Sequence, residues 1–163
     1  MATEIERKFL VQTDLWHPPP TGKPIRQGYL CTMADRAVRV RIAGDAGYLT
    51  IKAARNENSR FEYEYPIPLP DADEMLDGLC EPPLIEKIRY TEHIGGLEWI
   101  VDVFSGDNEG LVVAEVELDY EGQPVELPPW TGLEVTRLPR YLNANLIRHP
   151  YRLWTAEERL LAV

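Results

Sequence analysis

Cysteine and histidine, the residues that build most disulfide frameworks and zinc sites, are scarce in this sequence. Its 163 residues include two cysteines and three histidines. Cys31 and Cys80 lie far apart in the sequence, without the C-x-x-C or Cys/His spacing of a zinc site, so neither bound zinc nor a disulfide framework is predicted. The histidines are scattered through loop-like segments, and none is predicted to act in catalysis.

Long hydrophobic runs are also absent, and basic charge is in deficit. No apolar segment approaches the roughly 20 residues that cross a bilayer. The first ten residues carry Glu, Arg and Lys where a secretory signal has an apolar core. We therefore expect a cytoplasmic protein with no membrane partner. With 17 Lys and Arg against 27 Asp and Glu, the net charge of −10 disfavours nucleic acid as a partner, because its phosphate backbone is also negative.

What the sequence has in abundance is alternation of apolar and charged residues. Side chains two positions apart on a strand share one face. Eight segments are predicted to be strands: residues 3–11, 25–32, 36–43, 48–53, 60–67, 84–91, 97–104 and 111–120. Tight turns at Gly44-Asp45 and Gly95-Gly96 favour antiparallel pairing. The length fits one domain, and we predict the α+β class, mainly antiparallel β, with the sheet closing toward a barrel.

A few short helices are expected beside the strands. The first begins near residue 70, with Asp71 as its N-cap and Glu74 completing a capping box, and its apolar stripe extends to Leu79. Residues 138–148 also have a helical pattern. A Thr155-x-x-Glu158 box predicts a further short helix.

Charged residues gather on the faces opposite the apolar ones, often as like-charged pairs. The carboxylates are Glu4, Glu6, Glu62, Glu64, Asp102, Glu115 and Glu117, and the cations are Lys8, Arg39, Arg41, Lys52, Lys87 and Arg89. One interpretation is a solvated outer face of the sheet. Neighbouring like charges repel, however, unless a ligand of opposite sign lies between them. If these faces point inward, the carboxylates suit Mg²⁺ or Mn²⁺ and the cations suit phosphate oxygens, so a polyphosphate with bound metal would match both sets.

Tyr29 has two interpretations. It follows Gly28, which would let the strand bend, and a buried or hairpin tyrosine is the simpler one. Its hydroxyl, together with Lys87 on a neighbouring strand, could instead bind a leaving phosphate or transfer a proton.

These motifs, in this order, resemble the CYTH superfamily, the triphosphate tunnel metalloenzymes, and most of all its short bacterial inorganic triphosphatases. The matching segments are Glu4-Ile5-Glu6-Arg7-Lys8, Val38-Arg39-Val40-Arg41, Thr50-Ile51-Lys52, Glu62-Tyr63-Glu64, Glu86-Lys87-Ile88-Arg89, Asp102, Glu115-Val116-Glu117 and Arg140-Tyr141-Leu142-Asn143. The resemblance implies an eight-stranded closed barrel, the triphosphate tunnel, over residues 1–150. Residues 151–163 would form a C-terminal tail.

The resemblance also implies roles for the charged residues. The seven carboxylates named above would supply the ligands of one or two Mg²⁺ or Mn²⁺ ions, and the six cations would bind the triphosphate. Tyr29 and Lys87 would act in catalysis. Arg140 is the candidate for one more phosphate contact, although the preceding Leu138-Pro139 departs from the family pattern and a role in helix packing is the alternative.

The function that we expect is metal-dependent hydrolysis of inorganic triphosphate to pyrophosphate and phosphate. A class IV adenylyl cyclase or a thiamine or nucleoside triphosphatase would use the same charged site on another substrate. A polyphosphate- or nucleotide-binding module without catalysis is the non-enzymatic alternative. The predicted partner is a small polyanion, and the chain is expected to be a monomer or a homodimer.

Overall fold

The computed structural model describes residues 3–57 and 59–160. Within these ranges the strands are β1 (Thr3–Val11), β2 (Lys23–Thr32), β3 (Arg36–Ala43), β4 (Ala46–Ala54), β5 (Ser59–Ile67), β6 (Ile85–Ile94), β7 (Leu97–Phe104), β8 (Val112–Glu117) and β9 (Thr131–Glu134). The helices are α1 (Leu69–Gly78), α2 (Asn143–Leu146) and α3 (Ala156–Leu160), and the 3-10 turns are η1 (Gly106–Asn108), η2 (Pro139–Tyr141) and η3 (Tyr151–Leu153).

The first eight strands close into an antiparallel barrel. Neighbouring strands follow the order β5-β4-β3-β2-β6-β7-β8-β1, and β1 then pairs with β5. This closing contact is short, because only Thr3 to Ile5 pair with β5, whereas the far end of β1 pairs with β9. The predicted mainly antiparallel eight-stranded barrel is confirmed. The short β9, which lies outside the ring, was not predicted.

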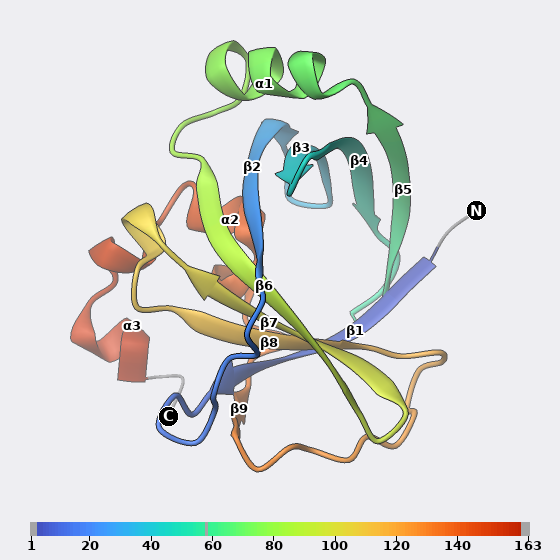
Figure 1. Cartoon of the computed structure of the whole chain (residues 1–163), viewed down its shortest axis with the longest axis vertical. Coiled ribbons are helices and arrows are strands. Elements are labelled where there is room, and N and C mark those ends of the chain that lie inside the picture. The colour runs from blue at the N-terminus through green and yellow to red at the C-terminus, as the bar shows by residue number, and fades with distance from the viewer. Residues whose placement is uncertain (1–2, 58, 161–163) are drawn as a thin grey trace.

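Apolar residues cover two parts of the outer barrel surface. Helix α1 packs over the outside of the barrel, where Ala72 and Leu76 meet Val40 of β3 (Figure 1). A second, aromatic cluster lies outside β1, β7 and β8, where the ring centroids of Trp99 and Trp130 are 5.6 Å apart. The apolar faces therefore point outward and are buried by added segments, which leaves the opposite faces for the interior.

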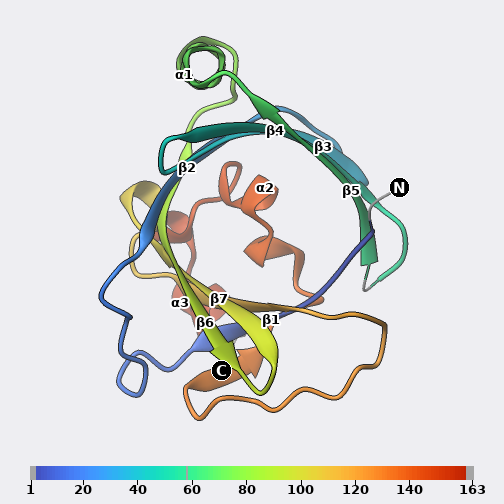
Figure 2. The ribbon, with the colours of Figure 1, turned by 45° about the vertical axis from the view of Figure 1, so that its right-hand side comes forward.

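The C-terminal segment, residues 135–160 after β9, folds back into one end of the barrel. Figure 2 shows α2 inside the ring of strands and α1 outside it. Tyr141, Leu146 and Trp154 pack in one buried cluster with Ile85 and Phe104. Because Ile85, Lys87 and Arg89 are two residues apart on β6, their side chains share one face, and this apolar cluster occupies the same inner face as the charged residues.

Two helix predictions need correction. Helix α1 begins at Leu69 without a side-chain cap, so Asp71 lies in its first turn and is not the N-cap. Pro70 near the start lacks an N–H, which reduces the need for a cap. Leu79 lies beyond the helix end and is exposed. The helix expected at residues 138–148 is interrupted by extended backbone at Leu142 and reduces to η2 and α2.

The capping box in the tail is confirmed. The Thr155 hydroxyl accepts a hydrogen bond from the Glu158 N–H at 3.1 Å, and the Thr155 N–H donates to the Glu158 carboxylate at 3.2 Å. The short helix α3 follows. None of the helices in residues 3–57 and 59–160 is long and apolar enough to span a membrane.

Candidate active site

A cavity of about 700 Å³ occupies the interior of the barrel. We call it the tunnel cavity. Predicted site residues that line it are Glu4, Glu6, Lys8, Tyr29, Arg39, Arg41, Lys52, Glu62, Glu64, Lys87, Arg89, Glu115 and Glu117. The interpretation of these faces as a solvated outer surface is therefore wrong. Closure of the sheet brings these carboxylates and cations from six strands around one space, together with Tyr29 from β2.

Strand register places opposite charges beside each other along β1. Lys8 lies opposite Glu115 of β8, and their Nζ and Oε1 atoms are 3.4 Å apart. Burial disfavours the Lys8 ammonium, but the nearby carboxylates of Glu115 and Glu6 outweigh this effect and raise its pKa. Burial likewise acts to raise the pKa of Glu115, yet Lys8 and Arg89 hold that pKa below its ordinary value. Both side chains are therefore charged at neutral pH.

Asp102 of β7 is the counter-ion of two cations on β6. Its carboxylate lies 2.8 Å from Lys87 Nζ and accepts two hydrogen bonds of 2.8 Å from the Arg89 guanidinium. Burial alone would raise the pKa of Asp102, but Lys87 and Arg89 keep it below its ordinary value. Asp102 does not line the tunnel cavity, and both of its oxygens are engaged. This geometry supports a role in holding the two cations rather than one as a metal ligand.

Lys87 has the lowest pKa among the cations of the cavity whose pKa is shifted, so its ammonium group loses a proton most readily. Burial lowers its pKa to about 7, with Arg89 and Arg41 acting in the same direction and Asp102 opposing them. Its ammonium also donates a 3.1 Å hydrogen bond to Asn143 Oδ1 on α2. Tyr29 lines the same cavity from β2, with 5% of its surface exposed. The predicted pair thus faces one space, and Lys87 can give up a proton near neutral pH.

Arg39 and Arg41 of β3 contribute guanidinium groups to the same cavity. Arg39 donates to the Thr50 hydroxyl at 3.2 Å, and Arg41 Nε donates to Gln27 Oε1 at 2.8 Å. Burial lowers the pKa of Arg41 to about 9, and the charges of Arg39 and Arg89 add to this effect. The buried Nε of Arg39 has no hydrogen-bond partner within the described ranges. An anion in the cavity would satisfy such donors and relieve the repulsion.

The remaining carboxylates outnumber the cations near them, so part of their negative charge is not neutralised. Burial and the Glu115 carboxylate raise the pKa of Glu6 to about 7, against the opposing effect of Lys8. Burial also raises the pKa values of Glu4 and Glu117. Lys52 is the main cation among them, 2.9 Å from Glu4 Oε2 and 3.8 Å from Glu62 Oε2. A bound cation would favour the charged forms.

The donor chemistry therefore fits a divalent metal, although the described side chains do not form a finished site. No group of three or more His, Cys, Asp or Glu side chains converges tightly enough to hold a metal among the residues described. The carboxylates instead occur as close pairs, such as Glu6 opposite Glu117 across β1 and β8. Oxygen ligands in such pairs suit Mg²⁺ or Mn²⁺ when phosphate oxygens or water complete the coordination.

Arg140 lies outside the tunnel cavity. Its guanidinium donates to the Glu158 carbonyl oxygen at 3.0 Å and lies 5.8 Å from the Trp154 ring centroid. The packing alternative fits this placement, because the main chain around η2 turns the side chain toward the C-terminal segment. The phosphate contact of Arg140 stays a prediction, and the contacts of its side chain in the structure are those of packing.

Sequence reasoning missed several cavity residues. Arg60 shares the strand face of Glu62 and Glu64, and the same two-residue spacing could have identified it. Asn143 and Arg148 reach the cavity only because the C-terminal segment folds back into the barrel. No local pattern signals that return.

Comparison with known proteins agrees with this architecture. The family model of the CYTH domain matches residues 2–151, nearly the whole chain. The chain belongs to the CYTH domain family. This CYTH domain is 49% identical over 152 residues to a protein of Acetivibrio thermocellus named inorganic triphosphatase, covering 93% of this chain and 97% of the relative. It is 40% identical over 152 residues to an inorganic triphosphatase of Nitrosomonas europaea, covering 88% and 96% of the two chains.

A solved structure shows the same fold. The crystal structure of the inorganic triphosphatase NE1496 superposes on this CYTH domain with a TM-score of 0.65 at 34% identity. The match covers 95% of this chain and 97% of that one. The similarity therefore extends over nearly the whole of both chains.

Proposed function

We propose that this CYTH domain hydrolyses inorganic triphosphate to pyrophosphate and phosphate inside the tunnel cavity, with Mg²⁺ or Mn²⁺ bound by its carboxylates. The observation that carries the proposal is the enclosure of both charge signs around one lumen. A triphosphate offers phosphate oxygens to the cations, and its metal complex offers a cation to the carboxylates. The names of the two relatives and of the solved structure support this substrate.

The cations of the cavity fall into two groups, both of which we assign to binding the substrate. Arg39, Arg41 and Lys52 have donors that face the cavity, and Lys8 and Arg89 are held in place by Glu115 and Asp102. Guanidinium groups bind phosphate with two parallel hydrogen bonds, whereas lysine acts as a point charge. Such positioning and charge stabilisation account for most catalysis of phosphoryl transfer.

The carboxylates would hold one or two divalent ions. The residues that fit are Glu4, Glu6, Glu62, Glu64 and Glu117. A divalent ion held there would neutralise charge on the phosphate oxygens. Glu115 and Asp102, which are already engaged with Lys8, Lys87 and Arg89, are better assigned as counter-ions.

The reaction breaks one phosphoanhydride bond. The oxygen of a water molecule bonds to a terminal phosphorus, and the bridging P–O bond breaks in line with it. Of the carboxylates that the divalent ions leave free, Glu4 or Glu6 is suited to orient this water in line with the bond and to accept its proton. Lys87, whose pKa burial lowers to about 7, is suited to donate a proton to the bridging oxygen of the departing pyrophosphate, with Tyr29 as a hydrogen-bonding partner of that group.

A substrate panel tests the proposal. Tripolyphosphate, ATP, GTP and thiamine triphosphate are each incubated with Mg²⁺, Mn²⁺, Ca²⁺ or a chelator, and released phosphate and cyclic AMP are measured. We expect phosphate release to be fastest from tripolyphosphate and to stop with the chelator. Formation of cyclic AMP would favour a cyclase, and preference for thiamine triphosphate or a nucleotide would favour those triphosphatases. Tight binding of tripolyphosphate without any product would identify a binding module.

A further inference from the structure

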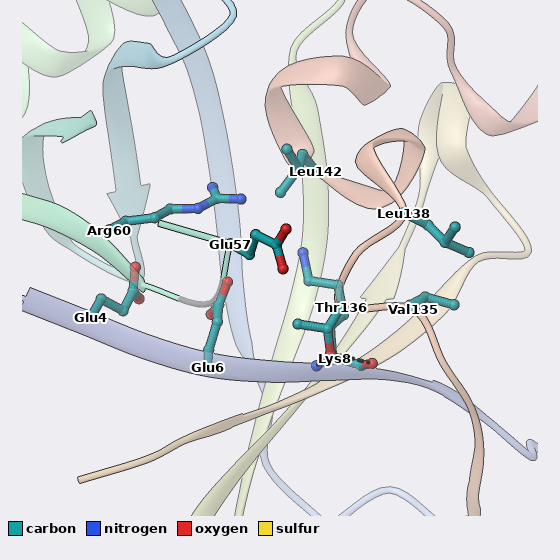
Figure 3. Close-up of a pocket in the computed structure, with 9 residues that line it drawn as sticks. All are labelled: Glu4, Glu6, Lys8, Glu57, Arg60, Val135, Thr136, Leu138 and Leu142. Atoms are coloured by element: carbon teal, nitrogen blue, oxygen red, sulfur yellow. Dashed lines mark hydrogen bonds between the residues drawn. The ribbon is translucent and has the colours of Figure 1, made fainter. Parts of the chain in front are cut away.

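Arg60 is an arginine of the tunnel cavity that matches none of the charged motifs. It lies on β5 at the seam of the barrel, opposite Glu4 of β1 on one side and Ala54 of β4 on the other. Its side chain lines the tunnel cavity and a small recess of it, whose other charged residues are Glu4, Glu6, Lys8 and Glu57. In Figure 3 the Arg60 side chain enters this recess from β5, while Glu6 and Lys8 project into it from β1.

The other cations near this seam are engaged by carboxylates. Lys52 lies 2.9 Å from Glu4, and Lys8 lies 3.4 Å from Glu115. The guanidinium of Arg60, by contrast, forms no hydrogen bond and no ion pair with any residue in the ranges 3–57 and 59–160. Glu57, which lines the same recess, is paired with Arg137 at 3.5 Å.

The surroundings of Arg60 indicate which ligand it takes. Arg60 is close enough to Lys8 to oppose the protonation of that ammonium and thus act to lower its pKa. Two cations that face one space repel each other until an anion lies between them. The planar guanidinium also offers donors that match two oxygens of one phosphate group.

We propose that Arg60 is a further triphosphate-binding residue. Together with Lys8 it holds one phosphate group of the triphosphate near the short contact between β1 and β5, which we call the β1/β5 seam. This assignment rests on the proposed triphosphatase function. Leu138 and Leu142 of the C-terminal segment line the same recess. Arg60 therefore binds the part of the substrate that lies against this segment.

The experiment compares three variants with the wild-type protein. Arg60→Ala removes the guanidinium. Arg60→Lys keeps the positive charge but lacks the two parallel N–H donors of the guanidinium group. Arg55→Ala is the matched control, because Arg55 is exposed at the end of the same hairpin, with its guanidinium 5.7 Å from the Phe61 ring centroid and outside the cavity lining. We measure kcat and KM for tripolyphosphate, and the rise in melting temperature that tripolyphosphate causes in each protein.

A charge-assisted hydrogen bond to phosphate predicts that Arg60→Ala raises KM by about 10- to 100-fold and reduces the tripolyphosphate-induced rise in melting temperature. Arg60→Lys should lie between Arg60→Ala and wild type, and Arg55→Ala should match wild type. The proposal is overturned if Arg60→Ala keeps the wild-type KM and melting shift while wild type turns over tripolyphosphate. If Arg60→Ala does not fold, the KM of Arg60→Lys decides, and an unchanged value overturns the proposal.

Failure of the triphosphatase function gives a different result. Wild-type protein would then release no phosphate from tripolyphosphate with any metal. The melting shift would still report whether Arg60 binds the polyanion. A shift that is equal in wild type and Arg60→Ala overturns the Arg60 assignment in that case too, and a shift lost in Arg60→Ala supports it.

Discussion

Lys87 Nζ lies 2.8 Å from Asp102 Oδ2, and the two side chains are 0% and 3% exposed. The pair is buried within the barrel between neighbouring strands β6 and β7, and Arg89 adds a second cation to the same carboxylate. Taking these charges out of water is costly unless each keeps its partners. The stability of the barrel and the orientation of two cations that we propose to bind phosphate therefore depend on one aspartate.

Replacing Asp102 by asparagine should impair both folding stability and activity. The Asp102→Asn variant leaves Lys87 and Arg89 buried without their shared counter-ion, and loss of one partner of a buried ion pair costs about 3 to 5 kcal/mol. Urea unfolding measures this loss in the free energy of unfolding, and turnover of tripolyphosphate should fall with it. Asp107→Asn is the control, because Asp107 pairs with Arg152 at the surface. Equal stability of the two variants would contradict the assigned role of Asp102.

The metal-free protein should lose stability as pH rises through the range in which Glu6 titrates. Its pKa of about 7 in the folded state is above the ordinary 4.5, so the folded protein holds a proton that the unfolded chain has released. The stabilising contribution is complete below pH 4.5 and disappears as pH rises through about 7. The free energy of unfolding should therefore fall over this range, by no more than about 3 kcal/mol.

Unfolding curves of wild type and Glu6→Gln between pH 4.5 and 8, with a chelator present, measure this effect. The Glu6→Gln variant should show a smaller decrease, because its amide does not titrate. Glu109→Gln, at an exposed position outside the tunnel cavity, should retain the wild-type slope. The same decrease in all three proteins would show that Glu6 is not its source.

Lys52 should matter for catalysis more than for stability. Its side chain is 22% exposed, so the ion pairs with Glu4 and Glu62 contribute little to folding. Loss of a positioned cation that stabilises developing charge commonly costs a factor of about 100 to 1,000 in rate. Lys52→Ala should thus lose turnover but keep its melting temperature within a few degrees, while Lys23→Ala, outside the cavity, should retain turnover. Near-normal turnover of Lys52→Ala would remove Lys52 from the site.

Helix α1 should stabilise the barrel without taking part in the reaction. Leu76 is 3% exposed and packs on the outside of the barrel, so Leu76→Ala should lower the free energy of unfolding by about 2 to 5 kcal/mol. The KM for tripolyphosphate should not change in the folded variant. Leu79→Ala, at a side chain that is 67% exposed, should have an effect below about 0.5 kcal/mol. Similar losses in both variants would contradict the packing of α1 described here.

The strands were predictable because burial acts on alternate residues. The period of two in Val38 to Ile42 and in Lys87 to Tyr90 marks one apolar and one charged face, whichever way the sheet curves. The boundaries of α1 were less predictable, since Asp71 and Glu74 match a capping box that the chain does not use. Pro70 near the helix start, which lacks an N–H, reduces the need for that cap.

The two-residue spacing of the charged residues did not show which of them are counter-ions and which are free to bind a ligand. Asp102 and Glu115 both alternate with apolar residues, as Glu117 does, yet each lies against a cation from another strand. Arg140 belongs to a matching motif but packs on Trp154, and Arg60 belongs to no motif but reaches the cavity. Which charge is neutralised depends on contacts between segments distant in the chain.

The sequence by itself determined the antiparallel strands, the set of charged residues that share one face of these strands and the CYTH resemblance, because side-chain periodicity and residue type are local properties. Tertiary structure alone decided that this set encloses a lumen, that the C-terminal segment occupies one end of it, and that Arg60 faces Lys8 across the seam. These outcomes depend on how β1 meets β5 and on where the chain returns, and contact between remote segments is not encoded in the spacing of neighbouring residues.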